Sequence, residues 1–231
     1  MNQLGIVVAL LVVLGVSAFF VFNTVSTDSS PMVEEMTALV RVAHLSPDAP
    51  NVDVWVDGAR VLENVPYEAF SGYLSLPAGP HRIQVSPAGQ AEPIVIDATV
   101  DVAAGRAYTV AATGLLGQGE LSPIVLNDDL MQAETRAKVR FVHTSPDAPA
   151  VDVAVVGGPV LFDGTAFRQD GGYLSVAPGD YDLEVRLAGT ETVVLSLPGV
   201  TLEAGANLSV FAVGQVGDQT LGALIALDAA L

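Results

Sequence analysis

The sequence predicts an all-β protein of two tandem immunoglobulin-like β-sandwich domains, preceded by an N-terminal hydrophobic helix. Three observations support this prediction. A domain-length segment occurs twice, each copy reads as seven or eight short strands between turn residues, and the beginning of the chain is almost wholly apolar. The expected parts are a hydrophobic anchor or signal segment at 1–25, a linker at 26–37, and sandwiches at 38–130 and 136–231.

The hydrophobic segment Leu4–Phe22 contains no charged residue. At about 1.5 Å of rise per residue it is long enough to cross a bilayer as a helix. It is apolar on every side, whereas a core helix is amphipathic. Two alternatives remain open. A retained membrane anchor fits the full length of the segment, and a cleaved signal peptide would end near the small residues Val16–Ala18.

The internal duplication begins with Val40–Pro50, VRVAHLSPDAP, which recurs as Val139–Pro149, VRFVHTSPDAP. Further along, Gly72–Ser75 recurs as Gly172–Ser175. The offset is 99 residues at the first motif and 100 at the second, so one residue was inserted between them. A repeat of this length is a whole domain rather than a solenoid unit.

Each copy is expected to form short strands separated by turn residues such as Pro-Asp, Asp-Gly and Ala-Gly. In Val52–Asp57, valines alternate with polar or aromatic residues, as a half-buried strand requires. Between the domains, Asp128–Ala137 is predicted to form a short turn of helix. The strands predicted in the first copy are Ala38–Leu45, Val52–Asp57, Arg60–Leu62, Tyr73–Leu76, His81–Ser86, Ile94–Val102, Tyr108–Ala112 and Leu121–Leu126.

The repeated motifs resemble domain of unknown function 4397, and the resemblance covers both copies. It is carried by the V-R-[VF]-x-H-x-S-P-D-A-P-x-V-D-V pattern and the later G-Y-L-S. The resemblance implies a β-sandwich fold and an exported location on bacterial or archaeal cells. It brings no established activity and no catalytic residues. The second copy departs from the first at Val156–Gly158, where the first has Asp57 and Gly58.

The charge balance excludes one class of partner. The formal net charge is -17, and the only lysine is Lys138. Such a surface repels the phosphate backbone, so we expect no binding to nucleic acid. The chain has no cysteine, which excludes disulfides, thiolate metal sites and a catalytic thiol.

A histidine-serine-proline-aspartate motif occurs once in each copy, and two interpretations are open. In the functional one, histidine and aspartate form a metal-binding or acid–base pair. In the structural one, histidine ends a strand, serine and aspartate bond the turn backbone, and proline fixes its φ angle. The structural interpretation is favoured. It covers His44, Ser46, Pro47, Asp48, His143, Ser145, Pro146 and Asp147.

No other motif indicates a cofactor, a metal or catalysis. Asp48, Asp53 and Asp57 carry oxygens suited to calcium, but Asp53 and Asp57 lie on one face of a strand rather than in a looping cage, so we expect no metal site. The glycine-rich Gly114–Gly119 is better explained as a hairpin loop than as a phosphate-binding loop. Trp55, opposite the valine face of its strand, is the best candidate for an exposed aromatic contact.

We therefore expect a non-enzymatic extracytoplasmic protein, membrane-anchored or at the cell surface, structural or adhesive in role. The alternative is a self-assembling, pilin-like extracellular filament subunit with the N-terminal helix or a strand in the assembly. A hydrolase of extracellular polymers ranks third. The expected partners are the membrane, through the N-terminal segment, and other copies of the chain. A glycan or an envelope component is a further candidate ligand, whose identity the sequence does not give.

Overall fold

The computed structural model describes residues 36–229, and every regular element in this range is a β-strand. The predicted hydrophobic segment and most of the predicted linker lie outside the described residues. In the described range, no helix is long and apolar enough to cross a membrane. The strands of the first repeat are β1 (Thr37–His44), β2 (Val52–Val56), β3 (Ala59–Val65), β4 (Leu74–Pro77), β5 (Gly79–Pro87), β6 (Ile96–Val102), β7 (Ala107–Thr113) and β8 (Ser122–Asp128).

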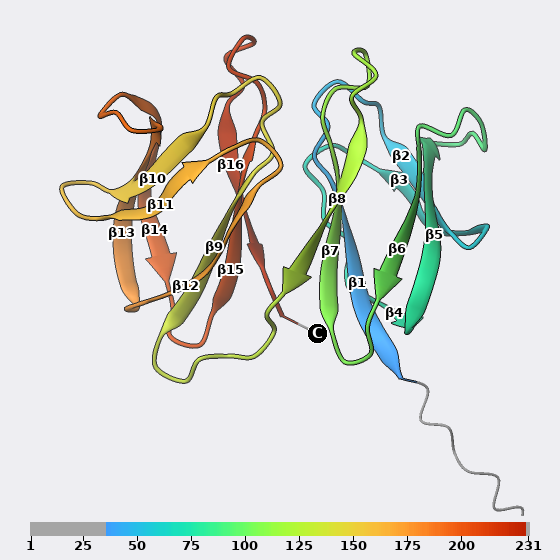
Figure 1. Cartoon of the computed structure of the whole chain (residues 1–231), viewed down its shortest axis with the longest axis horizontal. Coiled ribbons are helices and arrows are strands. Elements are labelled where there is room, and N and C mark those ends of the chain that lie inside the picture. The colour runs from blue at the N-terminus through green and yellow to red at the C-terminus, as the bar shows by residue number, and fades with distance from the viewer. Residues whose placement is uncertain (1–35, 230–231) are drawn as a thin grey trace, which may run out of the picture. The chain divides into compact units, whose positions relative to one another are not determined.

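The second repeat has eight strands in the same order (Figure 1). They are β9 (Ala137–His143), β10 (Val151–Val155), β11 (Val160–Thr165), β12 (Asp170–Val176), β13 (Gly179–Leu187), β14 (Val193–Leu202), β15 (Asn207–Val213) and β16 (Gly222–Leu227). The predicted helical turn between the repeats is wrong: residues 129–136 contain no helix. Polar side chains hold this linker instead, because Asn207 Nδ2 donates to the carbonyls of Asp129 and Met131.

Each repeat is a sandwich of two four-stranded sheets. In the first repeat the sheets have the orders β4-β1-β7-β8 and β3-β2-β5-β6. In the second they are β12-β9-β15-β16 and β11-β10-β13-β14, which is the same topology. The pairs β1–β7 and β9–β15 are parallel, and all other neighbours are antiparallel.

This topology corrects the immunoglobulin-like part of the fold prediction. Constant-type immunoglobulin domains pair strands A-B-E-D and C-F-G. Lettered in chain order, each repeat here has the sheets D-A-G-H and C-B-E-F. The error has a physical cause. Alternation and turn residues determine where strands lie, whereas which strands pair depends on long-range packing that a local pattern does not encode.

Alternating side chains fill a separate core in each sandwich. In β1, Ala38, Val40 and Val42 point into the first core, which holds mostly valine and isoleucine. In β9, Val139 and Phe141 point into the second core. The residues between them in sequence lie on the opposite face of the same sheet.

That opposite face is also buried, because the sheets containing β1 and β9 pack against each other. A third apolar cluster joins the two repeats there, and Figure 1 shows the two sandwiches side by side. Residues 36–229 therefore belong to one compact unit. The buried members of this interface cluster are Ala43, Leu45, Ala111, Leu126, Val142, Phe211, Val213 and Ala226.

Candidate functional site

The duplicated histidine motif fastens one loop to another. It follows β1, and its Asp48 carboxylate accepts the backbone N–H groups of Leu116 and Gly117, each at 2.7 Å. Ser46 Oγ donates to the carbonyl of Gly114 at 2.7 Å. All three partners belong to the loop between β7 and β8. The side chains thus bond a second loop, whereas the sequence predicted bonds to their own turn.

The second repeat repeats this geometry. Asp147 accepts the N–H groups of Val216 and Gly217, each at 2.8 Å, and Ser145 donates to the carbonyl of Gly214 at 2.8 Å. Gly214 has a φ of 77°, and a Cβ there would lie 2.1 Å from the Thr220 carbonyl oxygen. Only glycine fits this close approach of the two sides of the loop.

Both motif histidines are buried and bond to backbone. The Nε2 atoms of His44 and His143 lie 3.0 Å from the carbonyl oxygens of Pro50 and Pro149. A carbonyl only accepts, so Nε2 carries the proton in each ring. Burial lowers the pKa of both histidines and keeps the rings neutral at neutral pH. Histidine and Asp48 therefore bond to different backbone groups rather than to each other.

We expect Asp48→Ala to loosen the β7–β8 loop without unfolding the sandwich. The substitution leaves two amide donors without their charged acceptor, so hydrogen exchange at Leu116 and Gly117 should accelerate about tenfold. Native-state hydrogen exchange by mass spectrometry measures the change. Asp101→Ala, at an exposed position of β6, is the matched control and should leave hydrogen exchange in this loop unchanged. Equal exchange in both variants would show that Asp48 does not hold the loop.

The aspartates considered as calcium ligands have separate structural partners. Asp53 is buried and accepts the N–H groups of Asn64 at 2.8 Å and Gly89 at 3.1 Å. These bonds, that from Asn64 first, lower the pKa of Asp53. Asp152 likewise accepts the N–H of Gly164. Within residues 36–229, no group of three or more histidine, cysteine or acidic residues is arranged to hold a metal.

Asp57 forms an ion pair with His81 that is absent from the second repeat. His81 Nδ1 lies 2.7 Å from Asp57 Oδ2, and its Nε2 lies 2.8 Å from the Pro77 carbonyl. Both partners accept, so the doubly protonated ring satisfies them best. The Pro77 carbonyl first, and then Asp57, raise the pKa of His81. The equivalent positions of the second repeat hold Tyr181 and Val156.

This pair predicts a pH dependence of stability. Because the folded pKa of His81 lies above the unfolded value of about 6.5, its stabilising effect is complete below that value. The effect is lost as the pH rises through the folded pKa. The unfolding midpoint of the wild type should therefore fall relative to that of His81→Tyr, which copies the second repeat, as the pH rises above about 6.5. Parallel pH curves for the two proteins would contradict this assignment.

Trp55 is half-buried on the outer face of β2. Its Nε1 donates to Ser86 Oγ at 3.2 Å, and the Arg60 guanidinium lies 5.8 Å from the ring centroid. The sequence-based expectation that Trp55 makes an exposed aromatic contact stays a prediction. The second repeat has Ala154 in this place, so the feature is not duplicated.

One buried polar arrangement was not predicted from the sequence: a reciprocal pair of arginines between the repeats. Arg41 of β1 pairs with Asp228, which follows β16 of the other repeat. Arg140 of β9 pairs with Asp128 at the end of β8, at 2.6 Å. All four side chains are at least 96% buried. Each arginine also donates to the carbonyl preceding the aspartate across the interface, at 3.0 Å.

Two tyrosines complete the network within their own repeats. Tyr73 donates to Asp128 at 2.7 Å, and Tyr173 donates to Asp228 at 2.6 Å. Burial raises the pKa of both tyrosines, so they act as neutral donors. The Arg140 guanidinium lies 4.7 Å from the Tyr173 ring centroid. One signal in the sequence marks this site: an arginine, a tyrosine and an aspartate recur in the second repeat at the offset of 99 or 100 residues.

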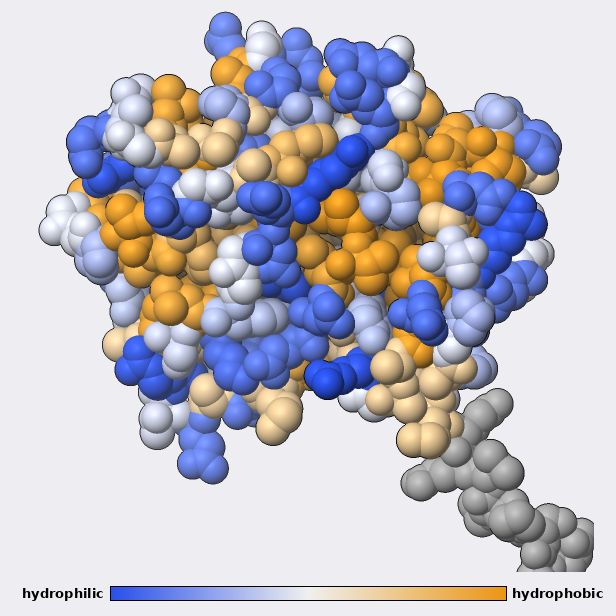
Figure 2. All heavy atoms as spheres, viewed as in Figure 1, coloured by the Kyte–Doolittle hydropathy of each residue, from blue (hydrophilic) through white to orange (hydrophobic). Residues whose placement is uncertain are grey.

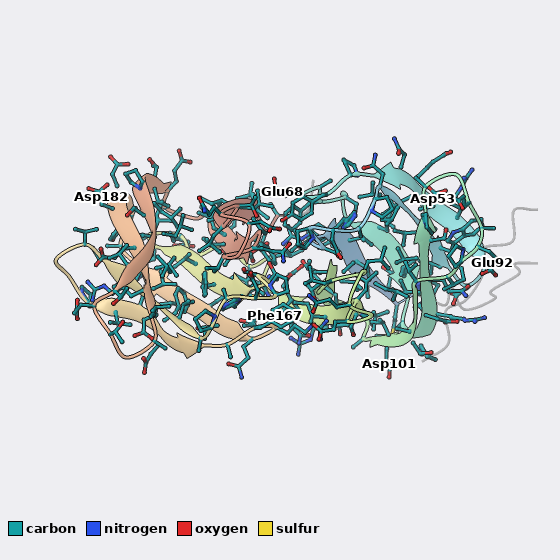
Figure 3. All side chains as sticks on the ribbon, turned by 90° about the horizontal axis from the view of Figure 1, so that it is seen from above. Asp53, Glu68, Glu92, Asp101, Phe167 and Asp182 are labelled. Atoms are coloured by element: carbon teal, nitrogen blue, oxygen red, sulfur yellow. The ribbon has the colours of Figure 1, made fainter. Side chains whose placement is uncertain are left out.

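Other contacts across the interface differ between the repeats. The Tyr67 hydroxyl accepts the N–H of Gly214 at 3.0 Å, and Arg168 Nε donates to Thr113 Oγ1 at 3.1 Å. The rings of Phe70 and Phe211 lie 5.1 Å apart. Figure 3 shows Glu68 and Phe167, the sequence neighbours of Tyr67 and Arg168, in the middle between the sandwiches.

The asymmetry makes the two halves complementary. Where the first repeat has Phe70 the second has Asp170, and where the second has Phe211 the first has Ala111. A pairing of two second repeats would set Asp170 against Phe211. The contact between unlike repeats pairs the two aromatic rings instead.

Comparisons with known proteins agree with the duplication. A family model described as domain of unknown function (DUF4397) matches residues 38–154 and again 137–230. Its first match continues past β8 into β10 and so includes Arg140 of the interface. A search of curated proteins gives no match. A crystal structure from Bacteroides fragilis, described as "a putative cell adhesion protein", has 10% identity, covers 82% of this chain and 97% of its own, and has a TM-score of 0.21.

Proposed function

The chain belongs to the DUF4397 family, and we propose that this member is a non-enzymatic extracytoplasmic surface protein with a structural or adhesive role. In this proposal the two sandwiches act as one rigid body that presents loops. The observation that carries it is the buried reciprocal contact between the repeats, with Arg41 and Arg140 each paired to an aspartate of the other half.

The buried contact supports a role in which the protein bears force or holds its loops out to a partner. Separate domains on a linker move independently unless their interface is large and apolar. Here eight buried apolar residues and two buried ion pairs join the repeats. The linker is also bonded to the second sandwich, through Asn207 and through Lys138, whose Nζ donates to the Met131 carbonyl. Force or a bound partner would therefore act on both sandwiches together.

The loops fastened by the motif support the presenting role. Figure 1 shows the β7–β8 and β15–β16 loops at the same end of the two sandwiches. Asp48 and Asp147 each hold one of them. A loop fixed in advance loses less conformational freedom when it binds, which is how rigid scaffolds present contact residues. In this proposal the polar side chains of the motif hold the two loops in place.

The proposal is tested on the full-length protein. Protease treatment of intact host cells, compared with lysed cells, measures whether residues 36–229 are accessible from outside. The purified protein in mild detergent is then screened for binding to envelope glycans and for hydrolysis of the same polymers. We expect external accessibility and no turnover. A protein protected until lysis, or one that cleaves a polymer catalytically, would contradict the proposed function.

A further inference from the structure

One edge strand lacks the protection that the others carry. The four sheets have eight edge strands, and natural sheets guard edges with proline, charge, short length or bulges. Register shifts occur at β3, β11, β12 and β14. Strand β4 is four residues long, β8 contains Pro123, and β6 contains Asp97 and Asp101. Strand β16 has none of these: it reads Gly222–Leu227, GALIAL, in unbroken register with β15.

The free backbone groups of β16 follow from its pairing with β15. The Asp228 N–H donates to the Asn207 carbonyl at 2.8 Å, just beyond the strand. Opposite residues in an antiparallel pair alternate between bonded and non-bonded. Residues 222, 224 and 226 therefore turn their N–H and C=O groups toward β15. Ala223, Ile225 and Leu227 turn theirs away from β15, where the described sheet has no further strand. The Leu227 carbonyl already accepts from Arg41 of the other repeat at 3.0 Å, so the groups without a partner strand are those of Ala223 and Ile225 and the N–H of Leu227.

The side chains of β16 are apolar on both faces. Leu224 and Ala226 pack into the contact between the repeats. Ile225 is 51% exposed and Leu227 is 58% exposed. Figure 2 shows apolar areas on both sandwiches between polar ones. In a chain with a net charge of -17, β16 is a continuous strand without charge, so a second copy can approach it without opposing carboxylates.

We propose that β16 pairs with β16 of a second copy of this chain, antiparallel and about a two-fold axis at Ile225. In this register Ile225 faces Ile225 of the second copy, and Leu227 faces the small Ala223. Each Ile225 exchanges two backbone bonds with its counterpart, and each Leu227 N–H donates to the Ala223 carbonyl of the other copy, while the Leu227 carbonyl keeps its bond from Arg41. Two four-stranded sheets then join into one of eight strands. The inference goes beyond the proposed function. A two-fold contact closes, so it produces a dimer rather than a filament.

The absence of cysteine from the chain allows a direct test by cross-linking. Ile225→Cys places one thiol beside the two-fold axis, where opposite Cα atoms in a bonded pair lie about 5.5 Å apart, within disulfide range. The matched control is Val125→Cys, at the equivalent position of β8. The Val125 side chain is 42% exposed, and Pro123, two residues earlier in the same strand, protects this edge from pairing. Full-length protein in mild detergent should give a disulfide-linked dimer with Ile225→Cys and not with Val125→Cys. Equal or absent cross-linking in both would overturn the proposal.

A charge substitution provides the second measurement. Ile225→Lys sets two like charges face to face and should raise the dissociation constant of the dimer about tenfold or more. Val125→Lys should leave it unchanged, and circular dichroism checks that both variants fold. Light scattering in the same detergent measures the mass. A monomeric wild type, or a dimer that persists in Ile225→Lys, means that β16 is not the contact. The second result would assign association to another part of the chain.

Discussion

Replacing Arg140 with alanine is expected to lower the free energy of unfolding by about 3–5 kcal/mol, because the change leaves buried acceptors without their charged donor. Arg140 is fully buried and donates to Ser209 Oγ at 2.9 Å and to the Asn127 carbonyl at 3.0 Å. Its partner Asp128 has no exposed side-chain surface. Denaturant unfolding of the full-length protein, followed by circular dichroism, measures the loss.

The control for this prediction is an ion pair on the surface. Arg82 pairs with Asp97, and its side chain is 59% exposed. Arg82→Ala should therefore cost less than about 1 kcal/mol. A double-mutant cycle of Arg140→Ala with Asp128→Ala isolates the coupling between the two side chains. A loss with Arg140→Ala no larger than with Arg82→Ala would show that the buried contact does not stabilise the protein.

Phe211→Ala is expected to destabilise the protein by about 3–5 kcal/mol, because it opens a cavity in the interface cluster. Phe211 is completely buried and packs against Phe70 of the other repeat. The substitution introduces the residue that the first repeat has at this position, Ala111, so the backbone accepts it. Only the fit between the repeats is lost.

The effect of Phe211→Ala has a distinctive signature. Because Phe211 lies between the repeats, hydrogen exchange should accelerate on both sides of the contact, in β7 as well as in β15. Val125→Ala, at an exposed position of β8, should cost less than about 1 kcal/mol. Accelerated exchange confined to the second sandwich would contradict a shared cluster.

The strands were predictable because their signal is local. Each strand predicted in the first repeat overlaps an observed one, and the alternation of Val52–Asp57 corresponds to an inner and an outer face of β2. The duplication carried the same prediction to the second repeat, whose sheets have the same order. Pairing was not predictable, because the parallel contact of β1 with β7 joins segments far apart in the chain.

The site was predictable in part. The motif around His44 was assigned to backbone bonding, and its serine and aspartate do bond backbone. Their partners lie 68 and 69 residues away, beyond the reach of a local turn argument. The role of Arg41 was missed for a different reason. A charged residue in an alternating strand is normally assigned to solvent, and only the packing of the second repeat buries it.

The contact between the repeats also limits how many repeats can join through it. Each sandwich uses the same sheet and the same arginine toward the other, so the contact is two-fold in type and saturates at two. A lone copy would expose its arginine and apolar cluster to water, and a third copy in a row would find both faces occupied. The stable unit is thus a matched pair of repeats. In proteins of this design we expect repeats to be added two at a time, with flexible linkers between pairs and rigid contacts within each pair.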